Sequence, residues 1–219
     1  MGRTAGQEPK KAFPALLHSL AHDLAQPLTT VHCFLELLAE RKPGAAPSAA
    51  ELRNAALQID RAIALSKGIS ALAREAGPAD DPWLPFDDLL NQTFENFNVL
   101  VHTGFLVFER LETGGILLTS HPALRHSLVI VIAKLAGQST TPIKITATAG
   151  LVGDHCHLDF SWKTDDSSGV GAQTAETVFA RDQNFLRELL QEAGADLIEC
   201  GDLASVTISA PAIPESRRP

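Results

Sequence analysis

The residues with the clearest chemical potential are His22 and Asp23, within the stretch HSLAHDLAQPLTTVHCFLELL from His18 to Leu38. A neutral imidazole nitrogen is a nucleophile, and a neighbouring carboxylate can accept a hydrogen bond from the second ring nitrogen and so fix the tautomer. Asp23 can also act as a base. Gln26 follows His22 by four residues, which places its amide one helical turn further along the same face. This set predicts group transfer at a solvent-facing imidazole.

A long amphipathic helix from about Phe13 to Glu40 is predicted to carry these residues. His22 is about 200° around the helix axis from Leu20, so it faces away from the apolar stripe. Pro27 removes an amide that would bond the carbonyl of Asp23, and we therefore expect a bend just after the histidine. Apolar side chains recur at intervals of three and four residues along one stripe, as in a bundle helix: Phe13, Leu16, Leu17, Leu20, Leu24, Leu28, Val31, Phe34, Leu35 and Leu38.

A second amphipathic helix follows, and the two are expected to form an antiparallel hairpin over residues 13–77. Arg41-Lys42-Pro43-Gly44 ends the first helix with cations and helix breakers. Ser48 and Glu51 predict a capping box at the start of the second. A lone hairpin cannot bury both apolar stripes. Pairing with a second copy into a four-helix bundle would cover them, and packing on the chain's own C-terminal domain is the alternative.

The rest of the chain is predicted to be an α/β sandwich, which follows a linker at 78–85 and spans residues 86–214. Helices packed on one face of a mixed sheet are expected, so the fold class is α+β. The helical patterns lie at 86–98, 122–136 and 182–193. The strand patterns lie at 106–111, 116–118, 143–149, 157–162, 195–200 and 205–210. Residues 1–12 are predicted to be a disordered tail, and residues 215–219 a C-terminal tail.

The stretch from His22 to Thr29 (HDLAQPLT) resembles the H-box of sensor histidine kinases. In that family the histidine is phosphorylated and passes its phosphoryl group to an aspartate of a response-regulator receiver domain. Weaker similarity continues into the C-terminal part, where Phe185 to Ala210 looks like the last helix-glycine-strand unit of the family's ATP-binding domain. The resemblance implies that His22 is the phosphorylated residue, with Asp23 as base and Gln26 orienting a water. It also implies a receiver-contacting segment: Pro27, Leu28 and Thr29.

The resemblance breaks down at the ATP site. Two helical asparagines of the family help bind magnesium and phosphate, but Ile130 and Lys134 stand at those positions, and neither side chain is a hard-cation ligand. The family also has an aspartate-x-glycine motif for adenine, and no register around Trp162-Lys163-Thr164 restores it. Gly169-Val170-Gly171 is a weak signal on its own. We therefore expect a degenerate ATPase-like domain that keeps the fold and has lost ATP binding.

Composition limits the compartment and the partners. The 219 residues carry a net charge of −8 with 45% apolar residues, and no basic patch predicts nucleic-acid binding. Three widely spaced cysteines indicate neither a disulfide framework nor a metal site. No apolar run is long enough to span a membrane, and no signal-peptide pattern opens the chain, so we expect a cytoplasmic protein.

Two other histidine pairs are weaker candidates. His18 and His22 are four residues apart, a spacing that can present two imidazoles to zinc, but no third ligand is evident. His155 and His157 flank Cys156 in a predicted strand, so the two histidines share one face and the cysteine points to the other. A partly exposed strand explains this second pattern.

The sequence predicts a homodimeric phosphorelay protein that carries a phosphoryl group on His22 and exchanges it with receiver-domain aspartates, without hydrolysing ATP itself. It resembles known phosphotransferases built as a dimeric hairpin with a degenerate kinase-like domain. We expect this chain to bind no cofactor, and Mg²⁺ to be held by the receiver. Two alternatives stay open: an active histidine kinase core with a divergent ATP site, and a non-catalytic dimeric scaffold that regulates a kinase or response regulator.

Overall fold

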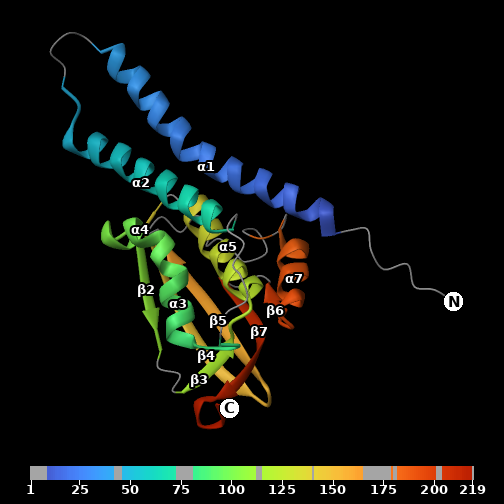
Figure 1. Cartoon of the computed structure of the whole chain (residues 1–219). Helices are drawn as coiled ribbons and strands as arrows, with labels where there is room; N and C mark the ends of the chain where they lie inside the picture. The colour runs from blue at the N-terminus through green and yellow to red at the C-terminus, as the bar shows by residue number, and fades with distance from the viewer. Residues whose placement is uncertain are drawn as a thin grey trace.

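The N-terminal part of the protein is a helical hairpin of α1 (Pro9–Ala39) and α2 (Ala49–Leu72), which pack against each other (Figure 1). The computed structural model describes residues 9–41, 46–72, 81–111, 115–139, 141–164, 179, 182–200 and 204–218. The hairpin and the α/β domain after it confirm the predicted fold class. None of the helices in these described ranges is long and apolar enough to cross a bilayer.

The capping box predicted for the second helix is present. The Ser48 amide donates to Glu51 Oε2 at 2.8 Å, and the Glu51 amide donates to Ser48 Oγ at 3.2 Å. Arg41, just after the end of α1, forms an ion pair with Glu51. The hydrogen bond from Arg41, followed by those from Ser48, lowers the pKa of the Glu51 carboxyl to about 2. These contacts tie the start of α2 to the end of α1.

The C-terminal part is an α/β domain whose elements lie close to their predicted positions. Its helices are α3 (Phe86–Phe94), the 3₁₀ turn η1 (Glu95–Phe97), α4 (Asn98–His102), α5 (Pro122–Gln138) and α7 (Gln183–Glu192). Its strands are β1 (Trp83–Pro85), β2 (Leu106–Arg110), β3 (Ile116–Thr119), β4 (Ile143–Val152), β5 (His155–Thr164), β6 (Asp196–Cys200) and β7 (Ser205–Pro214), followed by the 3₁₀ turn η2 (Glu215–Arg217).

The strands form one mixed sheet of seven strands in the order β1-β3-β7-β5-β4-β2, with β6 also paired to β7. Strands β2 and β4 are parallel, and the other pairs are antiparallel. Helices α3 and α5 lie over the sheet, and the hairpin crosses the end of the domain (Figure 1). The sheet therefore supports α5, and α5 in turn supports the hairpin.

One hydrophobic core joins the hairpin to the α/β domain. Leu20 of α1 and Leu65 of α2 are fully buried in the same cluster as Val131 of α5 and Phe160 of β5. Helix α5 is apolar on nearly all sides because it is covered by the sheet on one side and by the hairpin on the other. The hairpin thus packs on its own C-terminal domain over part of its surface.

The start of α1 corrects one boundary. The helix begins at Pro9, so residues 9–12 are helical, although the sequence predicted a disordered tail over 1–12. Proline is tolerated in the first turn, where its missing amide would have no helical partner. Residues 1–8 lie outside the described residues, as do 73–80 at the predicted end of the hairpin and the start of the linker.

Two further boundaries differ from the predicted ones. Trp83–Pro85, predicted as linker, form β1 at the edge of the sheet, where Pro85 costs no ladder hydrogen bond to a further strand. The predicted C-terminal tail also packs on the domain. The Glu215 amide donates to the carbonyl of Gly115 at 2.6 Å, and Arg218 forms an ion pair with Asp81.

Candidate functional site

The candidate site lies where α1 crosses the α/β domain. Two consecutive residues of α1 have opposite environments: the His22 side chain is 60% exposed, and the Asp23 side chain is 7% exposed. His22 Nδ1 lies 3.9 Å from Asp23 Oδ1, too far for a hydrogen bond but within ion-pair range. The structure therefore confirms that His22 faces away from the buried stripe. It places the carboxylate on the Nδ1 side of the ring.

The second oxygen of Asp23 is held by the α/β domain. Lys134 of α5 donates to Asp23 Oδ2 at 3.0 Å, and its Nζ also lies 2.7 Å from Asp182 Oδ2 at the start of α7. All three side chains are buried. A buried ion pair contributes little net stability, but the loss of one partner is costly because the other charge is left uncompensated. The three charges thus fix how α1, α5 and α7 meet.

The last turn of α5 is fitted to both hairpin helices. Arg61 of α2 is 4% exposed and donates to the carbonyls of Ala136 and Gly137 at 3.2 and 2.9 Å. These carbonyls belong to the end of a helix and have no intrahelical partner, so the guanidinium satisfies them. A Cβ added to Gly137 would lie 2.9 Å from the Cβ of Asp23, closer than real packing allows. Glycine at this position lets α1 approach α5.

The predicted bend of α1 has a visible counterpart. Helix α1 is continuous, but its axis changes direction near the middle of its length (Figure 1). Pro27 cannot donate to the carbonyl four residues earlier. Thr29 Oγ1 and Thr30 Oγ1 donate to the carbonyls of Ala25 and Gln26 at 2.9 and 3.1 Å, and such back-bonding also favours bending.

The other predicted site residues divide between different faces of α1. Gln26 and Thr29 are exposed and lie about 40° and 20° from His22 around the helix axis, so they share its face. Leu28 is 51% exposed but lies about 120° from His22, on another face. Pro27 is buried. The structure thus brings Gln26 and Thr29 together with His22 and separates Pro27 and Leu28 from it.

The two residues that the sequence comparison placed at the asparagine positions, Ile130 and Lys134, offer no oxygen ligand. Ile130 is fully buried in the core, and the ammonium of Lys134 faces two carboxylates with which it pairs. A cation at the position of a metal ligand repels Mg²⁺ and offers it no oxygen. Residues 165–178, which include the glycine pair of the sequence, lie outside the described residues.

The two weaker histidine patterns show no cluster of ligands. Within the described ranges, no three His, Cys, Asp or Glu side chains are grouped so that they could hold a metal. In β5, Cys156 is fully buried while His155 and His157 are partly exposed, which confirms the predicted alternation. Burial raises the pKa of the Cys156 thiol to about 11, so it stays protonated.

The sequence pattern missed two residues that shape the site. Lys134 was recognised only as an unsuitable metal ligand, but it contacts Asp23 across 111 positions of sequence. Arg61 also gave no local signal of its contact with the end of α5. A long-range ion pair leaves no periodic trace in the sequence, so only the folded structure reveals these contacts.

No family model matches the sequence, and neither does any curated protein. Among solved structures, the chain is similar to the histidine kinase AdeS of Acinetobacter baumannii, with 12% identity and a TM-score of 0.47 over 87% of this chain and 97% of that one. It is also similar to a structure described as a bacterial phosphotransferase, with 15% identity and a TM-score of 0.47 over 95% and 100% of the two chains. The histidine kinase ThkA, in complex with the response regulator protein TrrA, has 10% identity and a TM-score of 0.48 over 96% of this chain and 66% of that one. At these identities the similarity concerns the arrangement of the backbone alone.

Proposed function

We propose that this protein is a histidine phosphotransferase of a two-component phosphorelay, in which His22 carries the phosphoryl group between receiver-domain aspartates. The environment of His22 is the observation that carries this proposal. Its side chain is 60% exposed, and its Nδ1 faces the carboxylate of Asp23. This arrangement favours the tautomer with hydrogen on Nδ1 and makes Nε2 the nucleophile.

The transfer needs no proton exchange with solvent. The lone pair of His22 Nε2 attacks the phosphorus of a receiver phosphoaspartate, an N–P bond forms, and the P–O bond breaks as the aspartate leaves with its electron pair. The imidazole gains positive charge, which the carboxylate of Asp23 offsets. The reverse sequence passes the phosphoryl group to a second receiver. The receivers supply Mg²⁺ and the acceptor aspartates, and this chain supplies position and a poised nucleophile.

The receiver is expected to dock on the face of α1 that carries His22. Gln26 and Thr29 are exposed on this face, about one and two turns from the histidine. Gln26 could also orient a water against the receiver's phosphoaspartate, which would give the protein a phosphatase activity. Leu28 lies on another face of α1 and Pro27 is buried, so we assign the contact with the receiver mainly to Gln26 and Thr29.

The geometry of α5 supports a carrier that does not use ATP. Lys134 is 1% exposed and committed to ion pairs with Asp23 and Asp182. A Mg²⁺ ion at this position would meet an ammonium group in place of an oxygen ligand. This mismatch argues against the alternative of an active kinase core.

A second copy of the chain is the expected cover for the remaining apolar surface of the hairpin. Large apolar side chains stay between 42% and 55% exposed at spacings of seven and four residues: Leu28, Leu35, Leu52, Ile59 and Ile63. We call this set the open face. Such spacing is typical of a bundle seam. Leu28 and Leu35 lie about 120° and 140° around the axis from His22, so pairing along the open face leaves the histidine accessible.

The test uses a radiolabelled phosphoryl group offered in two ways. In one arm the full chain is mixed with labelled ATP and Mg²⁺; in the other it is mixed with a receiver domain labelled on its aspartate. We expect label on the wild type from the receiver only, and none on His22→Ala. His32→Ala is the matched control, because His32 is an exposed histidine of the same helix, 3.3 Å from Glu36, and it should label like the wild type.

Each other outcome favours a named alternative. Label from ATP alone would contradict the loss of ATP use and restore the kinase. Label that persists in His22→Ala would contradict the assignment of the carrier residue. Binding of the receiver without label, unchanged in His22→Ala, would favour the scaffold.

A further inference from the structure

The Asp23 carboxylate connects the candidate nucleophile to the C-terminal domain. One oxygen, Oδ1, lies 3.9 Å from Nδ1 of His22, and the other, Oδ2, accepts a hydrogen bond from Lys134 at 3.0 Å. With one oxygen held by a buried lysine, the plane of the carboxylate is set by α5. The orientation of Asp23 toward the imidazole therefore depends on a residue from the other part of the protein.

Packing around Asp23 leaves this carboxylate little freedom. Gly137, one turn beyond Lys134, meets the Cβ of Asp23, and Arg61 anchors the end of the same helix to α2. His22 on the same helix and Asp182 at the start of α7 each face one member of the pair, and Arg61 of α2 binds the carbonyl of the adjacent Gly137. Lys134 thus lies between two carboxylates in a site closed to water.

We propose that Lys134 is a positioning residue for phosphotransfer: it orients Asp23 so that the carboxylate lies on the Nδ1 side of the His22 ring, where it favours hydrogen on Nδ1 and leaves Nε2 free to attack. The C-terminal domain then takes part in the reaction through the residue that stands where the kinase family has a metal ligand. This inference rests on the proposed function of His22. It assigns to the degenerate domain a chemical role besides a structural one.

The orientation can be measured without any receiver. The ¹⁵N chemical shifts of an imidazole distinguish the Nδ1–H from the Nε2–H tautomer. In the wild type we expect His22 to be mainly the Nδ1–H tautomer at a pH where the ring is neutral. Lys134→Met should shift His22 toward the tautomer mixture of a free imidazole, and so should Asp23→Asn. Lys144→Met is the matched control, because Lys144 is an exposed lysine 2.8 Å from Glu109, and it should leave the spectrum unchanged.

Lys134→Met removes the buried ammonium that pairs with Asp23 and Asp182, so a loss of stability is expected from this variant whatever its effect on His22. The double variant Lys134→Met with Asp182→Asn removes one charge of each sign, so the net charge of the cluster stays that of the wild type. It should fold and should still show the altered tautomer of His22. Asp182→Asn alone keeps the contact between Lys134 and Asp23 and should retain the wild-type tautomer.

The kinetic test measures single-turnover transfer from a phosphorylated receiver. We expect a rate about 100-fold lower for Asp23→Asn and about tenfold lower for the charge-matched double variant. Adding Asp23→Asn to the double variant should slow it no further than Asp23→Asn alone, because Lys134 acts through Asp23. A wild-type tautomer and rate in the folded double variant would overturn the proposal, as would strictly additive losses. If the wild type accepts no label at all, the proposed function fails, while the tautomer still decides whether Lys134 orients His22.

Discussion

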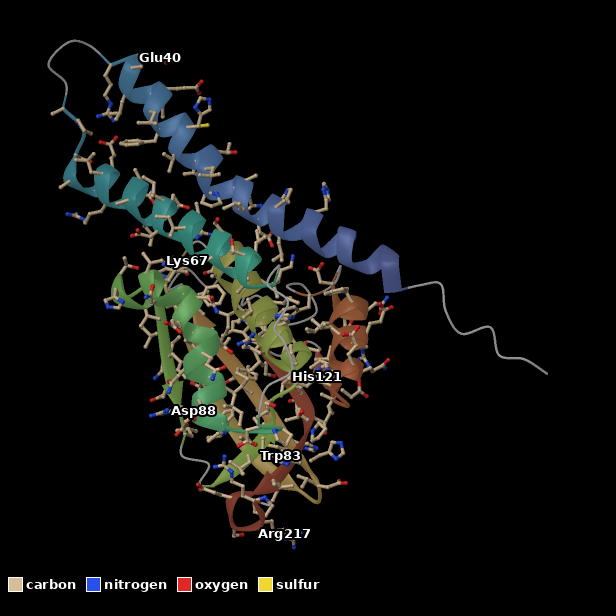
Figure 2. The ribbon with its side chains drawn as sticks, in the orientation of Figure 1. Glu40, Lys67, Trp83, Asp88, His121 and Arg217 are labelled. Atoms are coloured by element: carbon tan, nitrogen blue, oxygen red, sulfur yellow. The ribbon has the colours of Figure 1, made fainter. Side chains whose placement is uncertain are left out.

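In most proteins apolar side chains are buried and charged ones are exposed, and two faces of the hairpin depart from this rule in opposite ways. The docked face, which packs on the α/β domain, buries charged residues: Asp23 and Arg61 of the hairpin, which meet Lys134 and the last turn of α5. The open face, defined above, exposes large apolar side chains instead. The hairpin projects beyond the α/β domain, with Glu40 far from Arg217 at the other end of the molecule (Figure 2).

The two faces therefore need different kinds of neighbour. A buried charge is tolerated only with a partner, so the docked face requires one particular neighbour, which is α5 of the same chain. An exposed apolar stripe can be covered by any surface of complementary shape, and a second copy of the hairpin would offer such a surface. We infer that the docked face sets the geometry of His22, whereas the open face sets the assembly.

Removal of Arg61 should have the largest effect on the docked face. We expect Arg61→Leu to lower the free energy of unfolding by about 3 kcal/mol, because two carbonyls of α5 and the Gln58 side chain lose their donor. Urea denaturation followed by circular dichroism measures this. Arg53→Leu, at an exposed position of the same helix, should change stability by less than about 0.5 kcal/mol. Equal losses in the two variants would contradict the role of Arg61.

An added methyl group between α1 and α5 should have the second largest effect on stability. Gly137→Ala places a Cβ 2.9 Å from that of Asp23, and we expect a loss of about 1.5 kcal/mol because the helices must move apart. Gly150→Ala in β4 is the control, since its added Cβ meets nothing within 4 Å. Thermal unfolding of both variants gives the comparison. A Gly137→Ala protein as stable as its control would show that the contact is loose.

A charge on the open face should change assembly and leave folding intact. We expect Leu35→Glu to weaken the proposed dimer about tenfold, or about 1.4 kcal/mol, because the carboxylate would enter an apolar seam. Sedimentation equilibrium measures the dissociation constant. Val152→Glu adds the same charge at a 57% exposed site of β4 and should leave it unchanged. A wild-type protein that is monomeric at high concentration would contradict the proposal that a second copy of the chain covers the open face.

The smallest effect concerns Glu51, at the turn between the two helices. Its pKa is lowered to about 2 by Arg41 and then Ser48, so its contribution to stability is complete above its ordinary value of 4.5 and is lost as the pH falls toward 2. Arg41→Ala should therefore raise the pKa of Glu51 toward 4.5 in an NMR titration. Arg53→Ala, which removes a cation that does not pair with Glu51, should leave the midpoint where it was. An unshifted midpoint in Arg41→Ala would exclude Arg41 as the main cause.

Prediction from the sequence succeeded where the signal is local. The apolar period placed His22 on an exposed face, and the spacing of Ser48 and Glu51 predicted a capping box that is present. Prediction was less successful at element boundaries. The strand β1 (Trp83–Pro85) was missed because it has three residues and because its pairing with β3 depends on residues far along the chain. The catalytic roles of His22, Asp23 and Gln26 stay predictions.

The sequence by itself determined the amphipathic helices, the order of helices and strands and the residues beside His22, because hydrophobic periodicity and capping act over a few residues. Only the tertiary structure decided that Asp23 turns inward and pairs with Lys134 of α5, which also pairs with Asp182 at the start of α7. Which buried charges become partners depends on how whole elements dock, and no local pattern encodes that arrangement. The candidate site at His22 therefore begins in a short motif, and the fold completes its surroundings.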